Sequence, residues 1–127
     1  GLGDGAGIPL QLALDSGCSR IFAILTRPKG FRKPAPDIGH SARLIANSYH
    51  KYPYVREALL TRNERYNAEL EKLEHLAEEG KAYIVYADKM AVSNNTTDLK
   101  KLRASYFDGY NQAQHEFSQW LEWLGIE

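Results

Sequence analysis

The first twenty-five residues restrict the fold more than any other part of the chain. Glycine occupies every second position from Gly1 to Gly7, so this stretch predicts a loop rather than a helix or strand. Pro9 suits the first position of a helix over 9–17, because proline has no N–H to leave unpaired there. The unbroken apolar run 21–25 is typical of a strand buried on both faces, as strands of parallel sheets are. This order of loop, helix and buried strand predicts an α/β fold.

The rest of the sequence continues the alternation of helices and strands. Ser41 is a candidate N-cap, Pro53 marks a break between two helices, and Gly109 is a candidate break or bend in the last helix. In chain order the sequence predicts helices over 41–52 and 53–79, a strand over 82–87 and a helix from 98 onward. Two parallel strands need neighbours, so we expect the C-terminal portion of a larger α/β sheet.

The start of the chain leads to the same expectation. It opens in a loop without an initiator methionine, so we expect it to be cut from a longer protein. On that interpretation residues 1–127 form a single C-terminal segment. Residues 1–36 end the core of the larger protein, and residues 37–127 are a helical extension with one further strand.

Composition excludes some classes of function. Sixteen basic and sixteen acidic side chains cancel, which argues against a dedicated nucleic-acid binder, since such proteins concentrate basic charge on one face. The one basic cluster, in residues 27–33, lies in a Gly/Pro-rich loop and is interpreted as solvated charge. Cys18 is the single cysteine, so no intrachain disulfide is expected, and we expect a small buried side chain in a reducing, cytoplasmic compartment. No apolar run reaches about 18 residues, so no transmembrane helix is predicted.

Other candidate sites are weak in the sequence. The glycine loop would suit a phosphate cradle, but no Lys-Ser/Thr pair follows it. The four histidines are scattered, so no metal site is predicted, and His75 and His115 are expected to face solvent. The charges over 56–79 are typical of a solvated helix face. Trp120 and Trp123 predict packing against a core or partner, with a lipid-facing helix as the alternative.

An ordered set of short motifs resembles the patatin-like phospholipases, particularly their bacterial branch. Asp4-Gly5-Ala6 is similar to the family's Asp-Gly-Gly/Ala motif, and the helix and strand that follow it end in Ile24-Leu25-Thr26-Arg27-Pro28. The later matching pieces, which extend the resemblance over nearly the whole chain, are Tyr52-Pro53, Glu57-Ala58-Leu59-Leu60, Arg62, Tyr66-Asn67 and the segment from Leu99 to Tyr110.

The resemblance implies a three-layer α/β/α hydrolase with a Ser–Asp dyad and no metal or organic cofactor. Its serine would lie in a Gly-x-Ser-x-Gly elbow, which these 127 residues do not contain. Asp4 would be the catalytic base. In an alternative alignment Gly1 ends an Asp-Gly-Gly motif, and the base lies just upstream. The substrate would be a lipid or lysophospholipid ester, with peripheral membrane contact by the parent enzyme.

Two other functions remain open from the sequence. The first is a non-catalytic α/β interaction module that forms a homodimer through its unfinished sheet or its Trp-bearing last helix. The second is a small ligand-binding domain that uses the N-terminal glycine loop. On the hydrolase interpretation, the isolated chain would show no ester hydrolysis above background and would associate with the missing N-terminal part.

Overall fold

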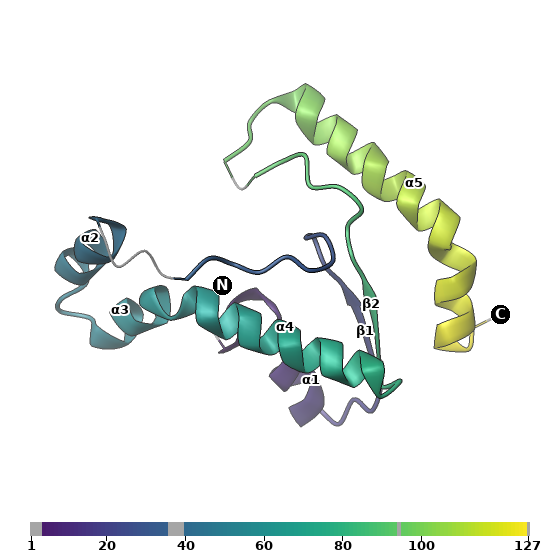
Figure 1. The fold of residues 1–127 in the computed structure, drawn as a ribbon, viewed down its shortest axis with the longest axis horizontal. Helices are drawn as coiled ribbons and strands as arrows, with labels where there is room; N and C mark the ends of the chain where they lie inside the picture. Colours follow the sequence, from purple (N-terminus) through teal and green to yellow (C-terminus); the bar gives the residue numbers. More distant parts are fainter. Residues whose placement is uncertain (1–3, 36–39, 94, 127) are drawn as a thin grey trace. The chain divides into compact units, whose positions relative to one another are not determined.

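The computed structural model describes residues 4–35, 40–93 and 95–126, and it has a mixed α/β fold (Figure 1). This confirms the α/β class predicted from the sequence. Two parallel strands, β1 and β2, form a sheet among the described residues. In chain order the elements are η1 (Asp4–Gly7), α1 (Leu10–Asp15), β1 (Ile21–Ile24), α2 (His40–Ser48), α3 (Pro53–Leu60), α4 (Arg62–Glu78), β2 (Ala82–Val85) and α5 (Leu99–Leu124).

The chain divides into two compact units, each built from two stretches of sequence. The first unit comprises Gly1–Ile21 and Arg32–Ala82, and the second comprises Phe22–Phe31 and Tyr83–Glu127. These units do not coincide with the division at residue 36, which concerns a larger sheet and stays a prediction. Each unit is described separately below.

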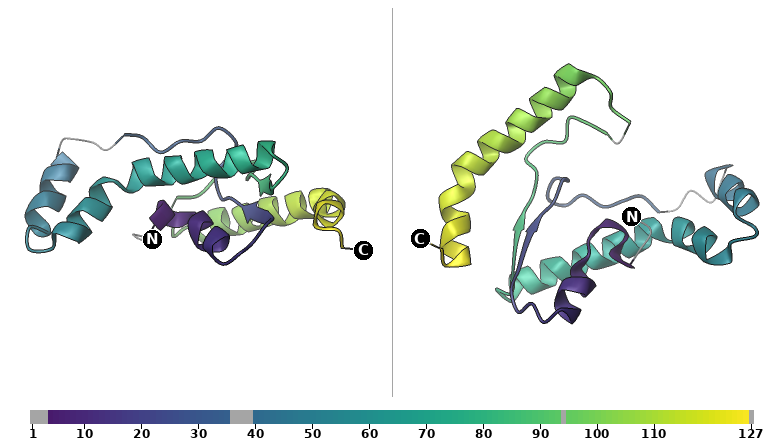
Figure 2. Two further views of the ribbon diagram at one scale, coloured as in Figure 1. Left: turned by 90° about the horizontal axis from the view of Figure 1, so that it is seen from below. Right: turned by 180° about the vertical axis from the view of Figure 1, so that it is seen from behind.

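The first unit has an apolar core where η1 packs on α4 and α1 packs on η1. Both views of Figure 2 show the N-terminal elements lying along α4. Leu70 and Leu73 of α4 are almost completely buried, and Tyr66 extends the same helical stripe. The buried apolar side chains supplied by the N-terminal segment are Ala6, Ile8 and Leu10.

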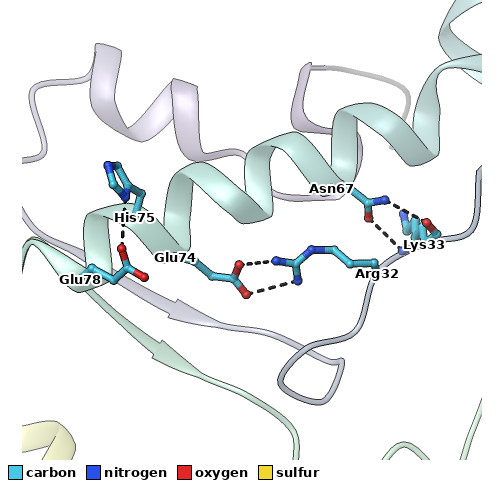
Figure 3. Close-up of polar contacts among 6 residues, drawn as sticks. All are labelled: Arg32, Lys33, Asn67, Glu74, His75 and Glu78. Atoms are coloured by element: carbon cyan, nitrogen blue, oxygen red, sulfur yellow. Dashed lines mark hydrogen bonds and ion pairs between the residues drawn. The ribbon is translucent and has the colours of Figure 1, made fainter.

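Polar contacts fasten an extended segment to the same helix. Asn67 on α4 accepts from the backbone N–H of Lys33 and donates to its carbonyl, with both distances 2.9 Å (Figure 3). Arg32 and Glu74 form a two-pronged ion pair (Figure 3). The Lys33 ammonium also lies 3.8 Å from the centre of the Tyr66 ring. Arg32 and Lys33, predicted to be solvated loop charges, therefore have specific partners on α4.

The second unit contains most of the sheet and the last helix. The Leu25 N–H donates to the Val85 carbonyl at 2.8 Å, which fixes the register of the two strands. Phe22 stacks on Tyr83 with ring centres 5.4 Å apart, and Trp120 and Trp123 pack around this pair at about 6 Å. The two tryptophans thus pack on aromatic side chains of the strands, and both stay partly exposed.

Helix α5 is fastened to the end of β2 by one amide side chain. Gln112 donates to the Tyr86 carbonyl at 2.7 Å and accepts from the Asp88 N–H at 3.1 Å. Asp98 caps the helix by accepting from the Lys100 N–H at 2.8 Å. The helix continues through Gly109, where the sequence left a break or bend open.

Three local expectations are corrected. The helix expected over 53–79 is interrupted at Thr61, whose hydroxyl bonds the Glu57 carbonyl at 2.9 Å and ends α3 before α4 begins. The helix expected to reach residue 52 ends at Ser48, while the side chain of its candidate cap, Ser41, lies outside what the structure describes. Cys18 is exposed rather than buried, because it follows the left-handed Gly17 in a surface turn after α1.

Candidate functional site

The turn η1, which carries the Asp-Gly-Ala motif, has an unusual backbone. Gly5 has φ 74° and Ala6 has φ 47°, so two consecutive residues adopt the left-handed conformation. The Ile8 N–H closes the turn by donating to the Gly5 carbonyl at 3.1 Å. A left-handed non-glycine residue costs on the order of 1 kcal/mol or more and persists where surrounding packing holds it. Ala6 meets that condition, since only 1% of its surface is exposed.

Asp4, the candidate base, is the first residue of this turn. Its side chain, together with Gly1 of the alternative alignment, lies outside what the structure describes. The backbone around the motif is nonetheless packed, because Gly5 lies against Glu69 of α4 and both Ala6 and Ile8 are buried. An aspartate in this position is therefore presented by a turn that is part of the apolar core.

A buried carboxylate, Glu69 on α4, lies against the turn. Only 7% of Glu69 is exposed, and its Oε1 pairs with the Lys72 ammonium at 2.6 Å. Its Oε2 is buried and has no hydrogen-bond partner among the described residues. A Cβ placed on Gly5 would lie 3.1 Å from Glu69 Cγ and 3.8 Å from its carboxyl carbon. The side chain of Glu69, chiefly its Cγ, thus lies closely against the motif glycine.

The sequence interpretation missed Glu69 by treating the charges over 56–79 as one solvated face. The signal was present in the spacing. Glu69 follows Tyr66 by three residues and precedes Leu73 by four, so all three share one face of a helix. A carboxylate inside an apolar stripe is the pattern that marks a buried polar group.

The same carboxylate argues against the glycine loop as a phosphate cradle. The Cγ of Glu69 lies 3.1 Å from the position of a Cβ on Gly5, so this side chain occupies space that a phosphate beside Gly5 would need. The left-handed turn is instead filled on its inner side by α4.

The other residues considered from the sequence do not assemble into a site. His75 is exposed and contacts Glu78 of the same helix at 3.2 Å (Figure 3), and His115 is exposed on α5, as predicted. Within residues 4–35, 40–93 and 95–126, no three His, Cys, Asp or Glu side chains gather in a way that would hold a metal ion. Over the same residues, none of the helices is both long enough and apolar enough to cross a membrane.

The second unit has a cavity of its own, of about 740 Å³, beyond the carboxyl ends of β1 and β2. Ligands of open parallel sheets bind at this edge. Apolar side chains such as Val85 and Met90 line one part of it, and the other part is polar. The polar side chains lining the cavity include those of Thr26, Asp88, Lys89, Ser105, Asp108 and His115. The cavity is broad and open to solvent, and the described residues place no buried titratable group in it.

More than half of the chain matches a known protein family. Residues 52–125 match the family described as "Domain of unknown function (DUF6363)". The chain belongs to the DUF6363 family. The matched range includes α3, α4, β2 and α5, so both the helix under the motif turn and the helix beside the cavity belong to the DUF6363 region. The motif turn itself precedes that region. No curated protein and no solved structure matches the chain.

Proposed function

We propose that the chain is the C-terminal part of a patatin-like serine acyl hydrolase that cleaves esters of lipids or lysophospholipids. In this proposal the aspartate of the motif turn, Asp4 or its counterpart just before Gly1, is the general base of a Ser–Asp dyad. The nucleophilic serine lies in a segment outside residues 1–127, since these contain no Gly-x-Ser-x-Gly. Helix α4, which lies in the DUF6363 region, packs against the turn.

The observation that carries the proposal is the structure of the turn. An Asp-Gly-Ala sequence stands in a strained left-handed turn, with its alanine buried and its glycine against a helix. Strained backbone of this kind collects at functional sites, where it fixes a reacting group. The buried turn leads through α1 into a strand of a parallel pair, which is the element order of the motif's neighbourhood in the hydrolases it resembles.

The chemistry requires both halves of the dyad. A serine hydroxyl is a weak nucleophile until an adjacent base takes its proton, and the tetrahedral intermediate needs donors for its oxyanion. Residues 1–127 would supply the base and its support, while the remainder of the protein would supply the serine and the oxyanion donors. Neither half alone would turn over an ester.

The test compares the 127-residue chain with the natural protein that contains it, using a short-chain nitrophenyl ester. We expect hydrolysis by the whole protein and none above background by the chain. Asp4→Asn tests the base: if Asp4 is the base, kcat should fall by at least about 10⁴-fold, the loss seen when the carboxylate of a Ser-His-Asp triad is replaced. Asp15→Asn, an exposed carboxylate on α1, is the matched control and should leave kcat unchanged.

Each result separates the alternatives. Unchanged turnover in Asp4→Asn, with loss on substitution of the upstream aspartate, assigns the base to the upstream position. Turnover by the 127-residue chain that Asp4→Ala abolishes would contradict the division of the dyad between two segments. No ester hydrolysis by the whole protein would contradict the hydrolase.

We also propose a second candidate, a dimerising interaction module, because α5 exposes aromatic side chains over much of its length. Tyr106, Phe107 and Phe117 are each more than half exposed, and none of the helix's described residues is buried. Exposed apolar patches of this kind mark interaction surfaces. Sedimentation would show a dimer that Phe107→Glu converts to a monomer. A monomeric wild-type chain at high concentration would exclude this candidate.

A further inference from the structure

The end of α2 and the start of α3 expose several aromatic and apolar side chains. We call residues 44–56 the hairpin segment. Tyr52 is 61% exposed and Tyr54 is 85% exposed. The other exposed apolar side chains of the segment are those of Leu44, Tyr49 and Val55. The two helices contact each other next to the N-terminal end of α4 (Figure 1), and no residue of α3 is buried. Exposed apolar groups gathered in this way mark a surface that binds a partner or a membrane.

The backbone of the hairpin segment is ordered by hydrogen bonds. The Tyr52 N–H donates to the Tyr49 carbonyl at 2.9 Å, and Pro53 begins α3 directly afterwards. The Arg56 N–H donates to the Tyr52 carbonyl at 3.0 Å, so the turn passes into α3 without an intervening loop. Because the turn is already formed, binding through its side chains would cost little backbone entropy.

The charge of this part of the chain is positive throughout. Residues 38–56 contain no Asp or Glu but three Lys or Arg side chains, two of which are the exposed Lys51 and Arg56. Among the described residues, neither of these two side chains forms an ion pair. Helix α5 also exposes aromatic and basic side chains, but Asp98 and Asp108 lie at either end of its basic stretch. The hairpin segment is therefore the exposed aromatic surface whose charge best complements an anionic one.

We propose that the hairpin segment docks the protein on the surface of a bilayer that contains anionic phospholipids. Tyr52 and Tyr54 enter the interfacial layer, where tyrosine combines an apolar ring with a hydroxyl that stays hydrated. Lys51 and Arg56 are attracted to the anionic headgroups around them. The inference extends the proposed hydrolase, because an enzyme of lipid esters meets its substrate at such a surface, but the binding itself requires no turnover.

The test is cosedimentation with vesicles of phosphatidylcholine, either alone or mixed with phosphatidylserine. It uses the 127-residue chain and the natural protein that contains it. We expect both to bind the mixed vesicles and to bind phosphatidylcholine alone at least about tenfold more weakly, since two cations lose their anionic partners. Added salt should weaken binding to the mixed vesicles, because it screens exposed charges.

Matched variants assign the contact to the hairpin segment. Lys51→Ala should lower the binding constant for mixed vesicles by about fivefold, and Tyr52→Ser should lower it by at least about threefold. The controls are Lys101→Ala and Tyr110→Ser on α5, where Lys101 is exposed and Tyr110 is 50% exposed. Neither control should change the binding constant. Far-ultraviolet circular dichroism confirms that each variant keeps its helices.

Several results would overturn the inference. These are no sedimentation with either kind of vesicle, equal binding to both kinds, and binding that Lys51→Ala and Tyr52→Ser leave unchanged. A loss in the α5 variants instead would assign the contact to α5. Binding by the chain but not by the natural protein would show that the rest of the protein covers the segment. A natural protein that hydrolyses no ester contradicts the hydrolase, while the vesicle measurement still decides whether the segment docks on a membrane.

Discussion

The two units of the molecule differ in how much apolar surface each one buries within itself. In the first, α4 buries Tyr66, Leu70 and Leu73 against the N-terminal elements, so a core exists within the unit. In the second, α5 buries none of its described residues, and Val85 is the one apolar side chain there that is buried among those the structure describes. The first unit therefore has a buried apolar core around α4, whereas the second has almost no fully buried apolar side chain among the described residues.

Both units nevertheless contain an amide side chain that forms hydrogen bonds with the backbone of an extended segment. Asn67 pairs with both backbone groups of Lys33, and Gln112 pairs with Tyr86 and Asp88. Such pairs fix the direction of a segment but contribute only about 1 kcal/mol each, so they do not replace a core. The difference in burial therefore predicts a difference in stability, with the motif turn in the more stable unit.

The largest expected effect is in the core of the first unit. Leu73 is fully buried, so Leu73→Ala should lower the free energy of unfolding by about 2–5 kcal/mol. Leu99→Ala in α5 is the control, because Leu99 is 69% exposed and should change stability by less than about 0.5 kcal/mol. Urea titration followed by far-ultraviolet circular dichroism measures both. Similar losses for the two variants would remove the contrast between the units.

Removing either of the two amide contacts should destabilise only the unit that contains it. Asn67→Leu and Gln112→Leu each leave two backbone groups without their partner and should cost about 1–2 kcal/mol. Both tryptophans lie in the second unit, so their fluorescence reports that unit alone. Only Gln112→Leu should shift the fluorescence transition. A shift of equal size with Asn67→Leu would show that the units unfold together.

Two glycine substitutions should change stability in opposite directions. Gly5→Ala places a Cβ in a left-handed turn and 3.1 Å from Glu69 Cγ, so it should destabilise the first unit by about 1–2 kcal/mol. Gly109→Ala meets nothing within 4 Å and lies inside α5, so it should stabilise the second unit by about 0.5–1 kcal/mol. Thermal unfolding of both variants measures the effects. A stabilising Gly5→Ala would contradict the packing of the turn on α4.

The smallest effect concerns pH. The hydrogen bond and charge of Lys81 lower the pKa of the exposed Glu79 carboxyl below its ordinary value. Because the folded-state pKa is the lower one, this pair stabilises the first unit above the unfolded pKa and is lost as pH falls through the folded pKa. Titration by nuclear magnetic resonance should find the lowered pKa, and Lys81→Met should return it to the ordinary value. An unchanged pKa in that variant would exclude the pair as its cause.

Local sequence chemistry predicted the elements of the fold well. Pro9 and Pro53 stand at helix starts, the strands follow the apolar runs after Arg20 and Lys81, and α5 begins directly after Asp98. These features depend on neighbours in sequence, so the sequence contains the information. Thr61 was missed as a helix end because a threonine hydroxyl that bonds the carbonyl four residues earlier also occurs within continuous helices, so the residue type does not mark a break.

The candidate site was predicted only in part. Asp4-Gly5-Ala6 was recognised as a motif, but the partner of Gly5 was not, since Glu69 lies 64 positions later and its burial depends on tertiary packing. The contacts of Arg32 and Lys33 with α4 were missed for the same reason. Long-range contacts of charged side chains leave little periodic signal, whereas apolar stripes do.

Amide hydrogen exchange in the 127-residue chain tests most directly whether the motif turn is built into the more stable unit. The account predicts that the Ile8 N–H, which closes the turn, exchanges as slowly as those of Leu70 and Leu73. It also predicts that amides in the middle of α5, such as that of Gln112, exchange at least about tenfold faster. Exchange of the Ile8 N–H at the rate of an open loop, or equal protection of α4 and α5, would contradict the account.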